Sequence, residues 1–279
     1  MRKAVIVGLG LIGGSIAQAL RGFEDFKVVG TDKSPEVRSR ALERGLIDEI
    51  SENTEDAIAS ADVVYLCMDP RGIIDMLAKL GDTFRPGALV TDVGGIKGAI
   101  MDGASALPES VDFIGSHPMA GRETSGVENA DAAIFAGAHY IITPRENSRP
   151  ENISLLRRMA AHMKFRDVVV TTPKEHDAII AYTSQVMHIL AVSVCDDPDL
   201  FRCRGFEGGS FRGCTRVAAL DVPLWTELFS MNADALCSVI KTLEDNLRAY
   251  RETIESGDAE RLAEKLAYSA ARKRKMDLE

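Results

Sequence analysis

Three glycines near the amino end have the spacing of a turn that binds phosphate. The pattern G-x-G-x-x-G is formed by Gly8, Gly10 and Gly13. It directly follows the apolar run at residues 4–7 and opens a helix-like segment. In that setting the glycines allow a tight turn, a close approach of the backbone to pyrophosphate, and close packing of helix on strand. The N–H groups at the helix start, at Leu11 and Ile12, are predicted to face the phosphates.

An acidic residue follows at the position that recognises ribose in dinucleotide-binding folds. Asp32 ends the second apolar run, at residues 27–31, and lies about 20 residues after the last glycine. A carboxylate there hydrogen-bonds the ribose 2′-hydroxyl and repels the 2′-phosphate of NADP, although Lys33 beside it weakens that repulsion slightly. The pattern predicts NAD as the cofactor. The alternative is a structural glycine turn with an aspartate on the surface.

His117 is the histidine whose neighbours indicate acid–base chemistry. It lies in the segment GSHPMAG at residues 115–121, directly after the apolar run at 112–115. Ligands of open α/β sheets bind at the carboxyl ends of parallel strands, so we expect this loop to face the ligand. Histidine accepts a proton near neutral pH, as the oxidation of an alcohol carbon requires. We interpret His139 and His162 as structural or surface residues.

The elements that must position these residues alternate along the first half of the chain. Strands are predicted at residues 4–7, 27–31, 62–67, 88–91, 112–115, 140–143 and 167–172. Helices are predicted at residues 11–20, 35–44, 72–80 and 150–162. Strands that alternate with helices imply crossover connections and a mostly parallel sheet. The sequence therefore predicts a Rossmann-type α/β domain at residues 1–172, which binds NAD.

The second half of the chain has a different pattern of apolar residues. Apolar residues recur with helical period over residues 174–194, 223–251 and 259–276, and no convincing strand is left. This pattern predicts an all-α domain at residues 173–279, with the domain boundary near Thr172. Helices that are apolar around much of their circumference must be buried on several sides. We therefore expect this half to form the interface of a homodimer.

The composition disfavours several classes of partner. The formal net charge is −9, which disfavours a general affinity for nucleic acid or for anionic membranes. We expect no membrane span and no signal peptide, because glycines cut the apolar run at the amino end. The five cysteines are scattered without paired spacing, so we expect reduced thiols and no metal site. These features predict a cytoplasmic protein that acts on a small molecule.

Several segments together resemble the prephenate and arogenate dehydrogenases of tyrosine biosynthesis, over essentially the whole chain. They are VGLGLIGGS (7–15), TDVGGIKG (91–98), GSHPMAG (115–121), ETSGVENA (123–130), FRGCTRVA (211–218) and PLW (223–225). The resemblance implies NAD-dependent oxidative decarboxylation of prephenate to 4-hydroxyphenylpyruvate. It implies that His117 draws off the proton of the ring hydroxyl while NAD takes the hydride. Arogenate, which has an amino acid side chain in place of the pyruvyl one, is the alternative substrate.

The resemblance also implies which residues of the helical half bind substrate. Arg216 would hold a carboxylate through its planar guanidinium, and Trp225 would help to wall the pocket. His188 and Gln185 occupy the substrate-facing positions of the long helix. The alternative for Arg216 is a salt bridge on a helix surface. The family also forms dimers through this half.

Three departures from the family pattern bear on the site. Gly95 stands where serine is common. If that hydroxyl orients the histidine, Ser116 or a water must substitute for it, or catalysis is slower. Gln185 stands in place of a histidine and cannot titrate near neutral pH. Cys214 replaces a threonine and is assigned no role. We interpret His176, at the start of the long helix, as structural.

Two other classes share the nucleotide-binding turn. The β-hydroxyacid dehydrogenases and imine reductases often have a lysine on a helix of the second domain and lack the GSHPMAG loop. A non-catalytic NAD sensor would need neither His117 nor Arg216. The histidine loop together with the Thr-Arg segment therefore favours the prephenate dehydrogenase hypothesis.

Overall fold

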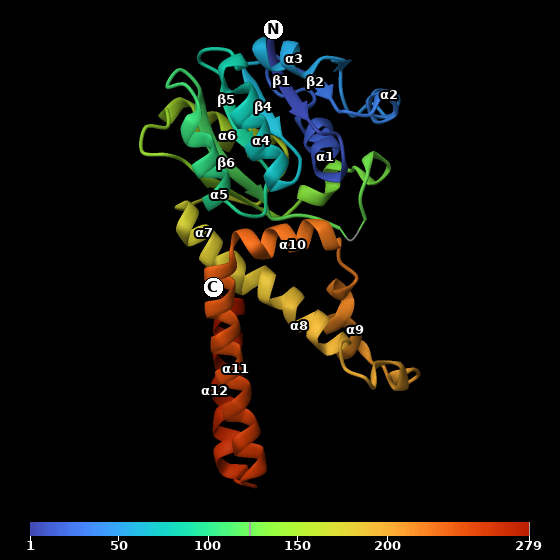
Figure 1. Ribbon diagram of the computed structural model, residues 1–279, viewed down its shortest axis with the longest axis vertical. Helices are drawn as coiled ribbons and strands as arrows, with labels where there is room; N and C mark the ends of the chain where they lie inside the picture. The colour runs from blue at the N-terminus through green and yellow to red at the C-terminus, as the bar shows by residue number, and fades with distance from the viewer. Residues whose placement is uncertain (123, 279) are drawn as a thin grey trace. The chain divides into compact units, whose positions relative to one another are not determined.

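The computed structural model describes residues 1–122 and 124–278 (Figure 1). Glu123, the first residue of the segment ETSGVENA, lies outside the described residues. By their internal contacts the residues divide into two compact units, Met1–Asn232 and Ala233–Glu279. The first unit holds the sheet and every residue that the sequence assigns to the site.

One sheet of eight strands organises the first unit. Its strands are β1 (Arg2–Val7), β2 (Phe26–Thr31), β3 (Glu49–Ile50), β4 (Val63–Leu66), β5 (Leu89–Asp92), β6 (Asp112–Pro118), β7 (His139–Thr143) and β8 (Asp167–Val170). They lie in the order β3-β2-β1-β4-β5-β6-β7-β8, and only the pair β6–β7 is antiparallel. The order reverses between β1 and β4, which is where doubly wound sheets bind their ligands. The expected mostly parallel sheet is confirmed.

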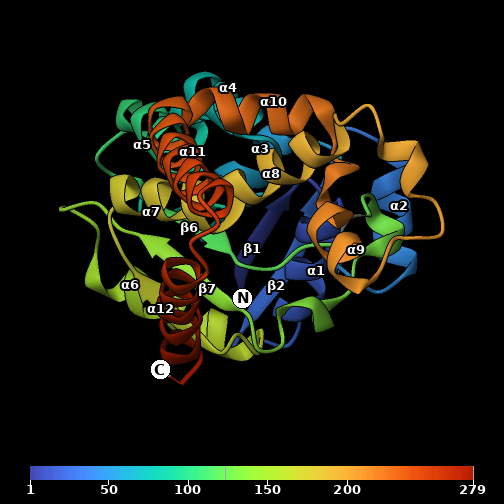
Figure 2. The ribbon, with the colours of Figure 1, turned by 90° about the horizontal axis from the view of Figure 1, so that it is seen from below.

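Helices cover both faces of the sheet, as Figure 2 shows. They are α1 (Leu11–Leu20), α2 (Pro35–Glu43), α3 (Thr54–Ala59), α4 (Pro70–Leu80), α5 (Gly98–Gly103) and α6 (Pro150–His162). Leu20 of α1 and Leu156 of α6 belong to the core on one face of the sheet. Leu77 of α4 and Ile100 of α5 belong to the core on the other. Strands buried on both faces read as continuous apolar runs, which is why the sequence located them well.

The rest of the first unit is helical. It contains α7 (Pro173–Ile180), a π-helical turn labelled η5 (Ala181–Gln185), α8 (Val186–Cys195), α9 (Gly209–Thr215), the 3₁₀ turn η7 (Arg216–Ala218) and α10 (Val222–Met231). Thr172 caps α7 by accepting a hydrogen bond from the amide of Glu175. In Figure 1, α10 lies across the carboxyl edge of the sheet. The helix predicted at residues 174–194 is therefore interrupted by a π-helical turn.

The second unit is a pair of helices, α11 (Ala233–Glu255) and α12 (Ala259–Leu278). Gly257 connects them with a φ of +69°, a conformation that glycine adopts at no steric cost. The Tyr250 hydroxyl lies 3.0 Å from the hydroxyl of Ser269 on the facing helix. Leu247, Ile254, Leu266 and Tyr268 are all more than half exposed in the single chain. The prediction of one helix over residues 223–251 was wrong, because two helices, α10 and α11, are separated there by Asn232.

Among the described residues, one helical segment is long and apolar enough to cross a membrane by length and composition alone. Pro173–Cys195 has a mean hydropathy of 1.6 over its most apolar window. By length and composition alone this is weak evidence, because a helix in a protein core passes the same test. The segment also carries three buried polar side chains, those of His176, Asp177 and Gln185. All three are hydrogen-bonded within the first unit.

Candidate functional site

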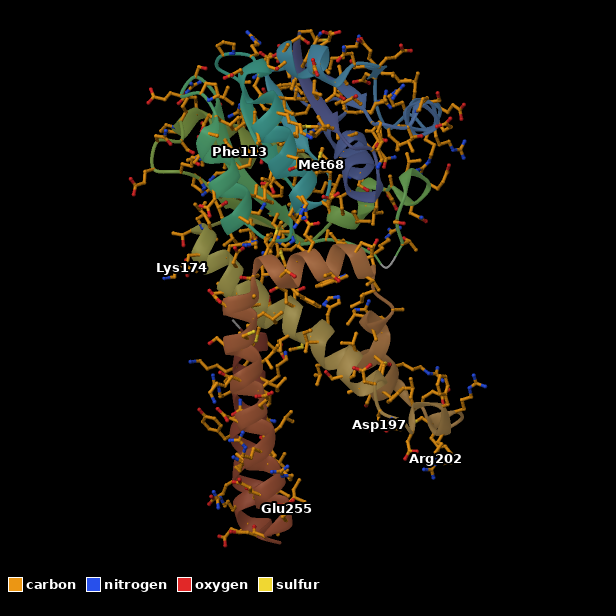
Figure 3. The ribbon with its side chains drawn as sticks, in the orientation of Figure 1. Met68, Phe113, Lys174, Asp197, Arg202 and Glu255 are labelled. Atoms are coloured by element: carbon orange, nitrogen blue, oxygen red, sulfur yellow. The ribbon has the colours of Figure 1, made fainter. Side chains whose placement is uncertain are left out.

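Two adjoining cavities lie in the first unit. The larger, of about 560 Å³, is lined by the glycine turn at residues 10–13, by the ends of β4, β5 and β6, and by η5 and α10. Met68, labelled in Figure 3, belongs to its wall just after β4. The smaller, of about 440 Å³, is lined by α8, by the chain around η7 and by the start of α10. The larger cavity therefore joins the nucleotide-binding turn to His117.

The glycine turn has the geometry that a dinucleotide needs. Gly8 has a φ of +90°, and a Cβ there would lie 2.3 Å from the carbonyl oxygen of Cys67. A Cβ on Gly13 would lie 1.9 Å from the carbonyl oxygen of Gly8, so helix and strand pack closely at this point. Nothing lies within 4 Å of a Cβ on Gly10, which leaves open space beside the first turn of α1. These residues fit the diphosphate of NAD.

Asp32 is held beside this turn by the backbone. Its carboxylate accepts one hydrogen bond from the amide of Leu9, at 2.9 Å, and one from the amide of Ser34, at 3.0 Å. Arg38 donates to the backbone carbonyl of Asp32 and not to its carboxylate. The carboxylate remains partly exposed. It therefore keeps acceptor capacity for a ribose hydroxyl.

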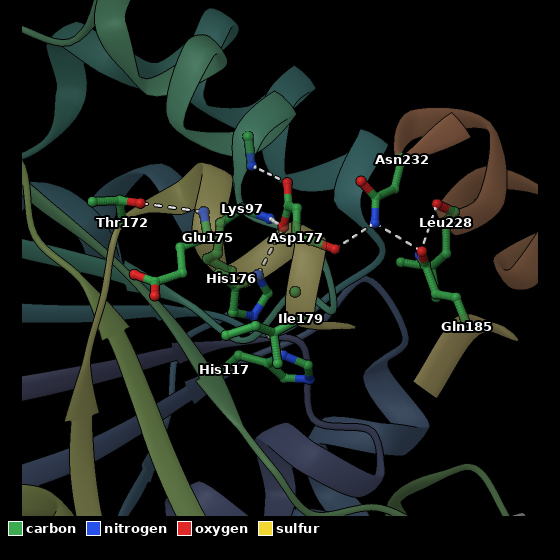
Figure 4. A network of polar contacts seen from close by, with 12 residues as sticks. Lys97, His117, Thr172, Glu175, His176, Asp177, Ile179, Gln185, Leu228 and Asn232 are labelled. Carbon is green, nitrogen blue, oxygen red and sulfur yellow. Dashed lines mark hydrogen bonds and ion pairs between the residues drawn. The ribbon is translucent and has the colours of Figure 1, made fainter. Parts of the chain in front are cut away.

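His117 is the first member of a chain of polar contacts, part of which Figure 4 shows. Its Nδ1 lies 2.9 Å from Nε2 of His176, and Nδ1 of His176 lies 2.7 Å from a carboxylate oxygen of Asp177. The Asp177 carboxylate also accepts hydrogen bonds from the amides of Lys97 and Gly98, at 2.7 Å each. Because a carboxylate only accepts, His176 donates from Nδ1 and accepts at Nε2. His117 then donates from Nδ1, so its Nε2 carries a lone pair.

The environment of His117 keeps this imidazole neutral. Burial lowers the pKa of His117 well below its usual value, and the positive charge of Lys97 lowers it further. A neutral imidazole whose Nε2 is unprotonated can accept a proton from a hydroxyl group. Since His117 lines the larger cavity, its imidazole can act as a general base on a ligand bound there.

The segment TDVGGIKG fixes His117 from two sides. Asp92 and Lys97 form an ion pair, and both side chains are fully buried. Asp92 accepts a hydrogen bond from the amide of Ser116, and Lys97 donates one to the Ser116 carbonyl at 2.8 Å. Burial lowers the pKa of Lys97, which the Asp92 carboxylate opposes. This pair anchors the backbone next to His117, while the amides of Lys97 and Gly98 hold Asp177 on the far side of the relay.

The hydroxyl of Ser116 does not take over the orientation of the histidine. His117 lies within β6 and not in a loop, and successive side chains of a strand point to opposite faces. The Ser116 hydroxyl donates to the carbonyl of Asp92 and accepts from the Tyr140 hydroxyl at 2.7 Å. Among the described residues the ring of His117 is oriented by His176. The expectation for Ser116 was therefore wrong, and the contact with His117 is made by His176, which the sequence led us to interpret as structural.

No signal in the sequence identifies His176 as the partner of His117. The two residues are 59 positions apart, and each lies in its own motif. The sequence does show His176 next to Asp177, four residues after Thr172, which caps α7. A histidine followed by a carboxylate near a domain boundary is a weak hint at most. Only the packing of α7 against the end of β6 brings the two rings together.

His188 and Trp225 form the inner wall of the smaller cavity. Their rings stack with centroids 3.6 Å apart and an angle of 29° between planes. His188 Nδ1 lies 3.0 Å from the carbonyl oxygen of Ser184, to which it donates. Burial lowers the pKa of His188, although this hydrogen bond opposes the shift. Trp225 lines both cavities.

Gln185, Gly95 and Arg216 occupy different environments. The Gln185 side chain donates to the carbonyl of Leu228 at 3.1 Å and accepts from Asn232 at 2.8 Å, so both of its ends are used within the chain. Gly95 lies against α10 in the wall of the larger cavity, where a Cβ would contact Leu228 at 3.4 Å. Arg216 is exposed and lines neither cavity, although the next residue, Val217, lines the smaller one.

Comparison with known protein families gives two matches that cover most of the chain. The family model described as prephenate dehydrogenase, nucleotide-binding domain, matches residues 16–176. The model described as prephenate dehydrogenase, dimerization domain, matches residues 172–268. The predicted boundary near Thr172 is tested by neither match and stays a prediction.

Related proteins and solved structures carry related names. A prephenate dehydrogenase of Lactococcus lactis is 33% identical over 88% of this chain and 70% of its own length. A cyclohexadienyl dehydrogenase of Zymomonas mobilis is 30% identical over 94% of this chain and 92% of its own. The prephenate dehydrogenase of Aquifex aeolicus with hydroxyphenyl propionate and NAD+ has a TM-score of 0.87, 30% identity, and coverage of 100% and 99% of the two chains. Synechocystis arogenate dehydrogenase has a TM-score of 0.85, 29% identity, and coverage of 99% and 100%.

A weaker likeness concerns the fold alone. The 3-hydroxyisobutyrate dehydrogenase of Mycobacterium tuberculosis has a TM-score of 0.54 and 15% identity. It represents the β-hydroxyacid class, which the sequence left open. The family matches agree with the nucleotide-binding fold of the first half and the helical second half. This chain belongs to the prephenate dehydrogenase family and is an NAD-dependent oxidoreductase.

Proposed function

We propose that the protein oxidises prephenate with NAD and releases carbon dioxide, giving 4-hydroxyphenylpyruvate. The observation that carries this proposal is the neutral imidazole of His117. It is half-buried in the wall of the cavity that also includes the nucleotide-binding turn, with Nδ1 bonded to His176 and a lone pair on Nε2. A base of this kind is required where a ring hydroxyl must lose its proton as hydride leaves the same carbon.

His117 is the catalytic base in this proposal. Bound NAD supplies the acceptor for the hydride of the hydroxyl-bearing carbon. His117 Nε2 takes the hydroxyl proton, and the hydrogen bond to His176, backed by the Asp177 carboxylate, stabilises the imidazolium. The ring carboxylate leaves as carbon dioxide, and its electron pair makes the ring aromatic. The proton then returns to the phenolate oxygen, so His117 is neutral again for the next turnover.

The other candidate residues have binding roles in this proposal. The cofactor is held by Gly8, Gly10, Leu11, Ile12, Gly13 and Asp32. The stacked rings of His188 and Trp225 form a wall for the substrate. Gln185 positions α10, because its side-chain amide donates to the Leu228 carbonyl and accepts from the Asn232 side chain.

Absorbance of reduced cofactor tests the proposed function directly. The purified protein is mixed with NAD and prephenate, and in a parallel reaction with NAD and arogenate. We expect faster reduction with prephenate and one carbon dioxide released per NAD reduced. Faster reduction with arogenate would make this an arogenate dehydrogenase, and no reduction with either would contradict the proposal.

Asp32 is expected to make NAD the better cofactor. In the proposed complex its carboxylate faces the position where NADP carries a phosphate, so kcat/KM should be higher with NAD. Asp32→Ala should narrow the gap because it removes the repulsion. Asp32→Asn is the matched control, since it keeps an acceptor for the Leu9 or Ser34 amide. Equal or better efficiency of the unmodified protein with NADP would contradict the assignment.

Arg216 is proposed to hold a carboxylate of the substrate, as the Thr-Arg segment of the family implies. Its support in the structure is its place beside Val217, which lines the smaller cavity. Arg216→Gln should raise KM for prephenate, because a lost charge-assisted bond costs about 1.5–3 kcal/mol. KM for NAD should stay the same. A rise in KM for NAD would instead assign Arg216 to the nucleotide site or to folding.

We also propose a cytoplasmic homodimer that buries the exposed apolar residues of the helical segments. Ile179 and Tyr182 on the first unit, and Leu247 and Ile254 on the second, are at least half exposed in the single chain. Light scattering across a dilution series should give twice the chain mass of 30.3 kDa. A stable and fully active species of single-chain mass would refute the dimer. Recovery of the protein in the membrane fraction of cells would contradict the localisation.

A further inference from the structure

Arg122 lies on the wall that the two cavities share. The residues common to both linings are Gly121, Arg122, Thr124 and Ser125 of the loop after β6, and Leu224 and Trp225 of α10. Among the described residues that line either cavity, Arg122 is the only arginine or lysine. We propose that Arg122 binds the side-chain carboxylate of the substrate and favours prephenate over arogenate. This inference rests on the proposed function.

The geometry of the substrate directs its carboxylates away from His117. The hydroxyl-bearing carbon and the carbon that carries both acidic groups lie at opposite ends of a six-membered ring. With the hydroxyl at His117, the acidic end must point toward another part of the cavity wall. The shared wall combines the apolar side chains of Leu224 and Trp225 with the guanidinium of Arg122. The shared wall therefore offers apolar side chains to the ring of the substrate and a guanidinium to its carboxylate.

The present partner of Arg122 leaves its guanidinium available. Arg122 contacts the carboxylate of Asp131 at 3.3 Å, and the two side chains are 47% and 45% exposed. An ion pair this exposed is weak. Asp131 lines neither cavity, and the contact engages one of the five N–H donors of the guanidinium. The same arginine can therefore hold Asp131 on one side and a ligand carboxylate on the other.

The chemistry of decarboxylation determines which carboxylate a cation can hold. The ring carboxylate must give up its electron pair to the ring as carbon dioxide leaves. A cation bonded to it would stabilise the charge in place and oppose that step. The side-chain carboxylate keeps its charge from substrate to product. Arg122 is therefore assigned to the side-chain carboxylate, which by the same argument is also the carboxylate proposed for Arg216.

The same contact distinguishes the two substrates of the family. Prephenate carries a carbonyl group next to this carboxylate, whereas arogenate carries an ammonium group there. A guanidinium attracts the first side chain by its net negative charge and repels the ammonium of the second. Loss of the Arg122 charge should thus weaken the binding of prephenate more than the binding of arogenate.

A binding experiment with product-like ligands separates this role from folding and from catalysis. 3-(4-Hydroxyphenyl)propanoate and its neutral amide are titrated into the NAD-loaded protein by calorimetry. Arg122→Gln should weaken binding of the acid by roughly tenfold to a hundredfold and leave the amide unchanged. Arg40→Gln is the matched control, because Arg40 forms a similarly exposed pair with Glu128 and lines neither cavity. In that control both affinities should stay the same.

Kinetics give the second readout. In Arg122→Gln the ratio of kcat/KM for prephenate to that for arogenate should fall, and Arg122→Lys should recover part of it. An unchanged ratio with unchanged affinity for the acid would overturn the inference. A rise in KM for NAD alone would also overturn it and assign Arg122 to the diphosphate. If the unmodified protein reduced NAD with neither substrate, the proposed function would fail, and the loss of acid affinity in Arg122→Gln would still be measurable.

Discussion

Replacement of His117 by asparagine is expected to lower kcat by roughly 10²–10⁴-fold, the usual contribution of a positioned general base. Asparagine keeps an amide that can bond to His176, so the relay loses its titratable group with little change in shape. KM for prephenate and KM for NAD should change little, because neither acidic group of the substrate depends on the imidazole. Stopped-flow measurement of NAD reduction at saturating substrate gives the number directly.

The pH dependence provides the control for this prediction. Only neutral His117 accepts a proton, so activity is lost as the pH falls through the pKa of this residue. Because burial lowers that pKa, the acid limb of kcat/KM should lie below pH 6.5, the usual range of histidine. The limb should disappear in His117→Asn. Near-normal turnover of the variant would show that His117 is not the catalytic base, and His188 would be the next candidate.

Replacement of Lys97 by methionine is expected to lower the free energy of unfolding by about 3–5 kcal/mol. The variant would leave the Asp92 carboxylate buried without its cation, and would remove a hydrogen bond to the Ser116 carbonyl. Urea unfolding followed by circular dichroism measures the change. Activity should fall as well, because the backbone next to His117 loses one of its two anchors.

Two controls test whether the loss of stability comes from the unpaired buried charge: a double variant and the replacement of an exposed lysine. In the pair Asp92→Asn with Lys97→Met no buried charge is left, so the double variant should be more stable than Lys97→Met alone. Lys79→Met on α4 removes an exposed lysine and should change stability by less than about 0.5 kcal/mol. A loss below about 1 kcal/mol in Lys97→Met would mean that the buried pair contributes little.

The sequence located the nucleotide-binding half because its signals are local. Strands such as β4 (VVYL) are buried on both faces and appear as continuous apolar runs. The glycine turn is recognised from three glycines within six residues, and the close contact at Gly13 is with the carbonyl oxygen of Gly8 in the same turn. The two-residue strand β3 was missed, because a pairing of two residues leaves no periodic pattern.

The histidine relay was predicted only in part because its contacts are distant in sequence. His117 was identified from its motif, but its partner His176 comes from a helix 59 residues later. The expectation for Ser116 failed because the strand continued further than its apolar run, and strand geometry then pointed the hydroxyl to the opposite face. Arg122 was not singled out, since a half-exposed arginine in a loop has no sequence pattern of its own.

The π-helical turn at Ala181–Gln185 implies that one extra residue is accommodated at a single point of this helix. A π-helical turn contains one residue more than an α-helical turn, so α8 keeps its facing relative to α7 although the sequence is one residue longer. Deletion of one residue within the turn should let an unbroken α-helix form, with His176 and His188 still on their present faces. Deletion of a second residue could not be absorbed in this way. It would rotate α8 by about 100° relative to α7 and turn His188 away from Trp225. The helix should therefore tolerate the loss of one residue at this turn far better than the loss of two.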